Sequence, residues 1–264
     1  MKIPLELTSS QVLSNYTPCA QDLERIQLRD GCFTMSGDGI FHTIQGEGTL
    51  LGQPATFIRL HFCNLACTWC DAWYTWRNDR EEYYKEPFNI RVEDLRSHIL
   101  RAQEIKGLKN IVPHIVFTGG EPMIQAPCIE QFLKLNPDLS AEIETNGTLM
   151  PSPYLLETVQ WNCSPKTSNS GNPQIRAKKV DVLLALAERN THFKFVCSTP
   201  DDIEEILRDY AFLPREQLLI MPEGITKEQN AAVYQKINAT ILKHGLKTSP
   251  RLQNIMYDCA SRRV

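Results

Sequence analysis

The sequence contains no run of about 18 apolar residues, the length that a membrane-spanning helix requires, so no transmembrane helix is expected. The first eight residues lack the apolar core of a signal peptide. The net charge of −3 argues against electrostatic binding to nucleic acid or to a membrane surface. No internal repeat or low-complexity linker interrupts the chain. Together these absences predict a cytoplasmic globular protein.

The chain is rich in cysteine, with nine residues of this type and no export signal. In a reducing compartment, clustered cysteines more often bind metal or react than form disulfides. The length of 264 residues and the hydrophobic fraction of 42% suit one large domain or two small ones.

Three of the cysteines, Cys63, Cys67 and Cys70, lie within eight residues, and no further Cys or His follows within ten. A structural zinc ion takes four protein ligands, usually in two separated pairs. A 4Fe–4S cluster normally takes four thiolates. Three thiolates therefore predict a cluster with one iron left open for a small molecule. The alternative is a zinc loop that a distant residue completes.

Strand and helix patterns alternate from residue 40 onward, which predicts an α/β fold with a parallel sheet. The predicted strands are 55–62, 114–118, 140–145, 160–164, 192–197 and 217–221. The predicted helices are 91–106, 126–135, 152–159, 178–189, 200–210 and 226–244. Six strands are fewer than the eight of a closed barrel. We therefore expect an incomplete barrel in a domain of residues 38–264, preceded by an N-terminal extension, 1–37, with a short helix near 21–28.

Several predicted strands place polar side chains on one face and apolar side chains on the other. The polar positions are Glu142, Glu144, Asn162, Ser164, His192 and Lys194. A parallel sheet with both faces covered is usually apolar on both. The pattern predicts a barrel interior that holds a charged ligand, or, alternatively, strands that are half exposed.

Polar and glycine-rich motifs follow these strands, at the edge where α/β proteins bind ligands. They are Thr118-Gly119-Gly120-Glu121-Pro122, Glu144-Thr145-Asn146-Gly147 and Ser164-Pro165-Lys166. The paired glycines would let the backbone approach a ligand closely, and Glu121 would bind a cationic group. Arg59 stands in an apolar strand, and a buried arginine needs a carboxylate partner. That partner is a substrate, or Glu142 or Glu144.

The cysteine spacing, with Trp69 before the last cysteine and the later Gly-Gly-Glu-Pro motif, resembles the radical S-adenosylmethionine superfamily. Within it, the chain resembles 7-carboxy-7-deazaguanine synthase over roughly residues 38–264. The motifs that carry this resemblance are IQGEG (44–48), FIRLHFCNLACTWCDAWYTW (57–76), FTGGEP (117–122), EIETNG (142–147), CSPK (163–166), FKFV (193–196), MPEG (221–224) and SRRV (261–264).

The resemblance implies an enzyme that contracts the ring of 6-carboxy-5,6,7,8-tetrahydropterin to 7-carboxy-7-deazaguanine and releases ammonia, on the route to deazapurines such as queuosine. It implies an incomplete (β/α)6 barrel, a homodimer, and an electron donor such as flavodoxin. By motif, Cys63, Cys67 and Cys70 would hold a 4Fe–4S cluster. Trp69, Asp71, Gly119, Gly120, Glu121, Ser164, Pro165 and Lys166 would contact S-adenosylmethionine. Ile44, Gln45, Gly46, Arg59, Thr118 and the C-terminal Val264 would contact the substrate.

The chain departs from the family at Ala72. The family normally has Thr or Ser after the Cys-Asp pair, and that hydroxyl ligates Mg²⁺ beside the substrate. Either a water replaces the hydroxyl, or the protein works without Mg²⁺, or it acts on another substrate. Two further alternatives are a radical S-adenosylmethionine enzyme that activates another protein and a non-enzymatic iron–sulfur electron carrier.

Overall fold

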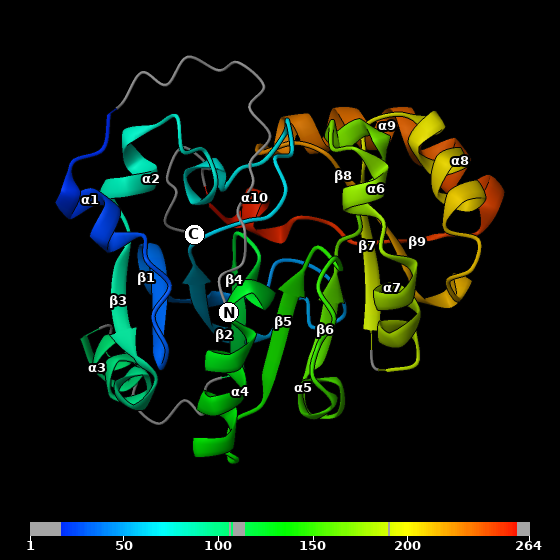
Figure 1. Ribbon diagram of the computed structural model, residues 1–264. Coiled ribbons are helices and arrows are strands. Elements are labelled where there is room, and N and C mark those ends of the chain that lie inside the picture. Colours follow the sequence, from blue (N-terminus) through cyan, green and yellow to red (C-terminus); the bar gives the residue numbers. More distant parts are fainter. Residues whose placement is uncertain (1–16, 106, 108–113, 190, 258–264) are drawn as a thin grey trace.

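A computed structural model describes residues 17–105, 107, 114–189 and 191–257. Its described strands form one open sheet in the order β3-β1-β2-β4-β5-β6-β7-β8-β9 (Figure 1). The strands are β1 (Cys32–Ile44), β2 (Pro54–Leu60), β3 (Phe88–Arg91), β4 (His114–Gly119), β5 (Ala141–Thr145), β6 (Gln160–Cys163), β7 (Thr191–Cys197), β8 (Leu218–Pro222) and β9 (Lys247–Thr248). The six predicted strands correspond to β2 and β4–β8, which run parallel. The predicted α/β class and incomplete barrel are confirmed.

The described helices are α1 (Ala20–Arg25), α2 (Glu81–Lys85), α3 (Leu95–Ile105), α4 (Ala126–Leu135), α5 (Pro153–Thr158), α6 (Gln174–Ala177), α7 (Val180–Ala187), α8 (Pro200–Asp209), α9 (Lys227–His244) and α10 (Leu252–Met256). All lie where the sequence predicts helices except the short α2, α6 and α10, which it does not predict. The Thr226 hydroxyl and the Gln229 side chain form a reciprocal capping box at the start of α9. Gly245 ends that helix with a φ of 59°. No helix among these residues is long and apolar enough to cross a bilayer.

The sheet extends further at its edges than the sequence predicts. β1 pairs antiparallel with β2, and β3 pairs antiparallel with β1. The predicted boundary after residue 37 falls inside β1, so residues 32–37 belong to the sheet. The bulge in β1 between Met35 and Ile40 explains why its alternation was hard to recognise, because a bulge breaks the period of two.

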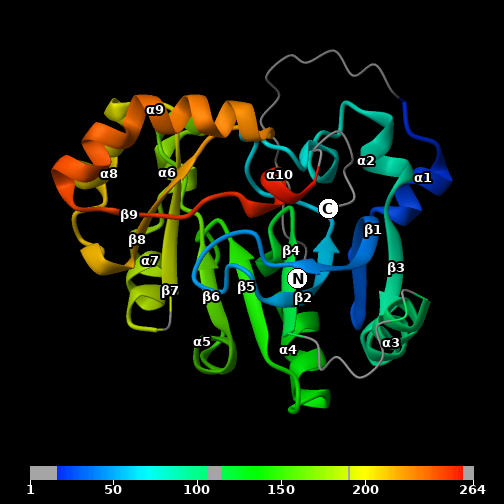
Figure 2. The same ribbon diagram turned by 180° about the vertical axis from the view of Figure 1, so that it is seen from behind.

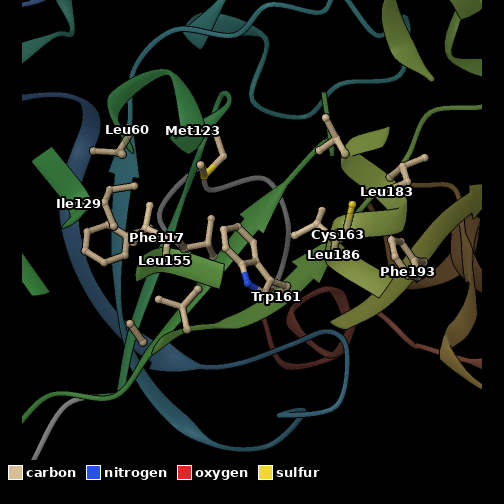
Figure 3. Packing of buried hydrophobic residues seen from close by; sticks show 14 of the residues in the cluster. Leu60, Phe117, Met123, Ile129, Leu155, Trp161, Cys163, Leu183, Leu186 and Phe193 are labelled. Carbon is tan, nitrogen blue, oxygen red and sulfur yellow. The ribbon is translucent and has the colours of Figure 1, made fainter. Parts of the chain in front are cut away.

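The main hydrophobic core lies between one face of the sheet and the helices that cover it. Phe117, Trp161 and Phe193, from β4, β6 and β7, are fully buried there. They pack against side chains such as Leu155 of α5 and Leu183 of α7 (Figure 3). This face is the apolar one that the alternation predicts.

The opposite face of the sheet is polar and also covered. The segment between β1 and β2 and the chain leading into α10 cross it, as Figure 2 shows from behind. The backbone N–H of Leu252 donates to the carbonyl oxygen of Gly46 at 2.9 Å and joins the two segments. Glu142, Asn162 and Lys194 on this face are at most 3% exposed. At these three positions the alternative of half-exposed strands is wrong, because buried polar groups face one another, whereas Glu144, Ser164 and His192 are partly exposed.

Candidate functional site

The cysteine loop begins directly after β2, at a sharp turn in the backbone. Phe62 has a φ of 78°, which is rare for a bulky residue and costs about 1–3 kcal/mol. The Phe62 N–H donates to the Thr75 carbonyl at 3.1 Å, and its own carbonyl accepts from the Glu121 N–H at 2.7 Å. These bonds hold the strained turn and point the chain from the sheet edge into the loop that starts at Cys63.

The three thiols of the loop are brought together in one cluster. Cys63 and Cys70 pack against a small buried cluster of Leu65, Cys67 and Ala177. The Asn172 side-chain amide donates to the Cys67 sulfur at 3.2 Å. Burial, with the neighbouring Asp71 charge, raises the pKa of Cys70 to about 12, and burial also raises the pKa of Cys63. These thiols need the positive charge of bound iron to become thiolates, so the donor set fits a metal cluster.

A zinc loop would need a fourth ligand beside the three thiols. The described part of the chain contains no group of His, Cys, Asp and Glu side chains assembled around a single metal position, so it shows no such fourth ligand. Cys163, the cysteine that ends β6, is fully buried in the main hydrophobic core. The three clustered thiols therefore stand without a fourth thiol ligand among the described residues.

Two motifs predicted to contact one cofactor lie side by side. The Lys166 ammonium is 5.4 Å from the centre of the Trp69 ring, within cation–π range. The same ammonium donates to the carbonyl and the hydroxyl of Ser164, each at 2.7 Å. Pro165 between them is buried. The loop after β6 thus reaches the cysteine loop, although Trp69 and Lys166 are 97 residues apart in sequence.

The paired glycines do permit a close approach, but to the protein's own backbone. A Cβ at Gly119 would lie 2.1 Å from the Leu60 carbonyl oxygen, and one at Gly120 would lie 2.0 Å from that of Phe62. The Gly120 N–H also donates to the Leu60 carbonyl at 3.0 Å. The glycines therefore seat the loop after β4 against the turn that precedes Cys63.

The Glu121 carboxylate faces the protein interior and is fully buried. It accepts hydrogen bonds from the Met123 N–H at 2.9 Å, the Thr145 hydroxyl at 2.8 Å and the Asn146 N–H at 2.6 Å. In this arrangement its hydrogen bonds join the loop that follows β4 to the end of β5 and the loop after it. Its predicted contact with a cationic group stays a prediction.

The polar face carries a hydrogen-bonded set that begins at the IQGEG motif. The Gln45 amide donates to Glu142 at 2.6 Å and to Glu144 at 3.3 Å. The Thr118 hydroxyl donates to Glu144 at 2.6 Å, and the Asn162 amide donates to Glu142 at 2.9 Å. Burial and the Glu144 charge raise the pKa of Glu142 to about 7. Gln45 and Thr118, both predicted substrate residues, therefore meet on one carboxylate.

Glu47 of the same motif joins three further side chains, two of which sequence reasoning missed. It accepts from Lys194 at 2.6 Å, from Gln253 at 2.7 Å and from Arg251 at 3.2 Å. Burial opposes its ionisation, but Lys194 and Arg251 lower the pKa of Glu47 to about 2. Arg251 and Gln253 come from the C-terminal segment, and no local motif marks them.

Arg59 lies half-buried on the polar face, with its guanidinium carbon 5.0 Å from the centre of the Phe41 ring. Glu142 and Glu144, the two protein partners that the sequence left open, bind Gln45 and other side chains instead. Among the described residues, Arg59 forms no ion pair or hydrogen bond through its side chain. Burial opposes the ionisation of Asp71, but Arg251 and, to a smaller extent, Arg59 lower the pKa of that carboxyl. No carboxylate among the described residues is hydrogen-bonded to the Arg59 guanidinium.

The remaining predicted residues differ in what they contact. The Asp71 carboxylate lies 2.5 Å from an Arg251 nitrogen. Ile44 ends β1, and Gly46 packs so tightly that a Cβ there would lie 1.9 Å from the Gln253 side-chain oxygen. Ala72 is buried and offers only a methyl group. The predicted contact of Val264 lies outside the described residues.

Comparison with known proteins agrees with this arrangement. The family model described as the Radical SAM superfamily matches residues 57–159. The 7-carboxy-7-deazaguanine synthase of Pyrobaculum aerophilum is 33% identical over 219 residues, which cover 81% of this chain and 90% of that protein. The protein of the same name from Escherichia coli is 32% identical over 182 residues, covering 63% of this chain and 74% of its own.

A solved structure shares the fold. The crystal structure of QueE from Escherichia coli matches with a TM-score of 0.60 and 25% identity, over 84% of this chain and 94% of that one. As a radical S-adenosylmethionine enzyme, the chain uses a 4Fe–4S cluster and S-adenosylmethionine, for which its three clustered thiols are suited. The chain belongs to the 7-carboxy-7-deazaguanine synthase family of radical S-adenosylmethionine lyases.

Proposed function

We propose that this enzyme converts 6-carboxy-5,6,7,8-tetrahydropterin to 7-carboxy-7-deazaguanine with release of ammonia. The observation that carries the proposal is the position of Arg59, whose guanidinium faces the polar interior without a described carboxylate partner. Arginine binds a planar carboxylate with two parallel hydrogen bonds. A carboxylated pterin supplies the anion that this site lacks.

The proposed cofactor residues come from the cysteine loop and from the loops at the ends of β4 and β6. Cys63, Cys67 and Cys70 would hold the cluster, and Trp69 with Lys166 would line the S-adenosylmethionine site. The other residues proposed for that site are Asp71, Gly119, Gly120, Glu121, Ser164 and Pro165. When bound, the cluster and S-adenosylmethionine supply one-electron reduction and hydrogen-atom abstraction.

The substrate residues would orient the pterin and exclude water. Arg59 would bind the carboxylate, and Thr118 with Gln45 would fix the hydrogen-bonding groups beside it. Glu142 and Glu144 hold the Gln45 and Thr118 side chains, so this polar part of the site is formed before the substrate binds. Ile44, Gly46 and Val264 complete the predicted contact set. The homodimer, an electron donor such as flavodoxin, and a cytoplasmic location stay predictions from the resemblance.

The direct test supplies the reconstituted enzyme with carboxytetrahydropterin, S-adenosylmethionine and a reductant, and follows the products by mass spectrometry. We expect both 7-carboxy-7-deazaguanine and 5′-deoxyadenosine. A Cys67→Ser variant serves as the control, since it should lose the cluster and form neither. Formation of 5′-deoxyadenosine alone would instead indicate a radical enzyme with another substrate, such as a protein. An absorption spectrum that does not respond to S-adenosylmethionine would favour an electron carrier.

A further inference from the structure

The residues at the expected magnesium position do not fit a magnesium ion. The resemblance implies a hydroxyl ligand at position 72, where this chain has a buried alanine methyl group. The neighbouring carboxylate, Asp71, is already bound to Arg251 at 2.5 Å. Mg²⁺ demands near-ideal octahedral oxygen ligands, commonly one or two carboxylates with several waters. The position therefore lacks one oxygen donor, and its nearest carboxylate is paired with a cation.

Arg251 forms the centre of a contact set that joins three loops. Its Nη2 lies 2.5 Å from the Asp71 carboxylate, at the end of the cysteine loop. Its Nε donates to Glu47 of the IQGEG motif at 3.2 Å, and its Nη1 donates to the Gly224 carbonyl at 2.5 Å. The side chain is 15% exposed. All three nitrogens of the planar guanidinium thus have fixed partners, which defines its position closely.

The charge around Arg251 is arranged as it would be around a bound cation. Glu47 and Asp71 approach from two loops, and the Gly224 oxygen approaches from the turn after β8. Two carboxylates and a carbonyl are oxygen ligands of the kind that a divalent metal prefers. Here these oxygens accept N–H bonds from one monovalent guanidinium. Glu47 also forms an ion pair with Lys194, at 2.6 Å.

We propose that the guanidinium of Arg251 replaces the magnesium ion, so that this enzyme needs no divalent cation and depends on Arg251 instead. The inference rests on the proposed function, because it concerns the charge beside the carboxylated substrate. Arg251 acts as a positioning residue: it ties the cysteine loop to the IQGEG motif through Asp71 and Glu47. Unlike a metal, this cation is covalently part of the chain and does not have to be recruited from solution.

The first test measures metal binding without catalysis. Reconstituted wild-type enzyme is titrated with Mn²⁺ in the presence of S-adenosylmethionine, and free Mn²⁺ is followed by electron paramagnetic resonance. We expect no site that Mg²⁺ competes for. The double variant Ala72→Thr/Arg251→Gln restores a hydroxyl and releases Asp71, so it should gain such a site. A competed site in the wild type, or none in a double variant with intact cluster absorbance, would contradict the proposal.

The second test compares product formation with Mg²⁺ and with EDTA. Wild-type activity should be the same in both, and Arg251→Gln should lose about 100-fold in EDTA, because loosening the loops misplaces the reacting groups. Arg251→Lys should recover part of this loss. Arg101→Gln on α3 should leave the rate unchanged, since Arg101 is exposed and far along the chain from the site.

The two tests separate this inference from the proposed function. A wild-type rate that requires Mg²⁺, or an Arg251→Gln variant as active as wild type in EDTA, would overturn the role of Arg251. If the wild type forms no 7-carboxy-7-deazaguanine under any condition, the proposed function fails. The Mn²⁺ titration still decides whether position 72 and Arg251 exclude a metal ion in that case.

Discussion

The side-chain amide of Gln45 donates a hydrogen bond of 2.6 Å to the carboxylate of Glu142, 97 residues later in the chain. This bond fastens the segment between β1 and β2 onto β5, across the polar face. The same amide lies 3.3 Å from Glu144, so it stands between two carboxyl groups that would otherwise repel each other. The contact gives the IQGEG motif a structural role, since it joins this segment to the sheet.

The buried Glu142 should make stability depend on pH. Its pKa rises from 4.5 to about 7 because of burial and the Glu144 charge. The folded protein then keeps a proton that the unfolded chain releases, so the free energy of unfolding should fall as the pH rises from about 4.5 to about 7, by about 3 kcal/mol in total. Urea unfolding of the cluster-free protein across this range measures the slope.

The Glu142→Gln variant should lack this slope, because an amide does not titrate and its oxygen can still accept from both Gln45 and Asn162, which donate to the same atom, Oε1. Glu188→Gln, at the exposed position directly after α7, is a matched control and should keep the wild-type slope. Equal pH dependence in Glu142→Gln and in wild type would show that another group causes it.

Arg59→Gln should weaken binding of the carboxylated substrate without weakening the fold. Loss of a charge-assisted bond of roughly 2–3 kcal/mol corresponds to an increase in KM of about 100-fold. Cleavage of S-adenosylmethionine in the absence of substrate should fall less than substrate turnover, because Arg59 forms no described hydrogen bond or ion pair with the cysteine loop and acts on its Asp71 less than Arg251 does. Steady-state kinetics of both reactions provide the comparison. Equal loss in the two reactions would remove Arg59 from the substrate site.

Gly120→Ala should disturb the cluster site through the backbone. The added Cβ would lie 2.0 Å from the Phe62 carbonyl and 3.1 Å from the Cys63 Cβ, so the turn before the cysteine loop must shift. We expect a loss of about 1–3 kcal/mol in stability and a low iron content after reconstitution. Gly52→Ala is the control: its φ of 91° is strained for alanine, but no atom lies within 4 Å of the new Cβ. Normal iron content in Gly120→Ala would contradict this prediction.

Asn172→Asp should make the cluster harder to reduce. The Asn172 amide donates to the Cys67 sulfur at 3.2 Å, while its oxygen accepts from the Ala66 N–H at 2.9 Å. Aspartate keeps the second bond, loses the first and adds negative charge, so the reduction potential should become more negative. A redox titration followed by electron paramagnetic resonance measures it. Asn238→Asp, on an exposed position of α9, adds the same charge and should leave the potential unchanged.

Much of the fold follows from local sequence. The alternation in β2 and β4–β8 and the helices between them are short-range patterns, and both survive in the structure. β1, β3 and β9 lie outside the predicted strands: a bulge interrupts β1, β9 has two residues, and β3 and β9 are the edge strands of the sheet. The short α2, α6 and α10 also lack a clear helical period.

The candidate site was predictable where its chemistry lies in consecutive residues. The spacing of Cys63, Cys67 and Cys70 alone indicated three thiols on one turn, and the structure gathers them. The paired glycines were recognised, but their neighbour was not: a sequence cannot say whether Gly119 and Gly120 approach a ligand or the backbone of β2.

The sequence by itself determined the class of enzyme, because ligand spacing and strand alternation are local properties that one chain segment encodes. Only the tertiary structure decided which charges meet. Arg251 and Asp71 are 180 residues apart, and their contact depends on where the C-terminal segment crosses the polar face. Glu142 and Glu144, the partners that the sequence leaves open for Arg59, accept from Gln45 instead. Ion pairing at such distances follows from strand order and register, which no local pattern contains.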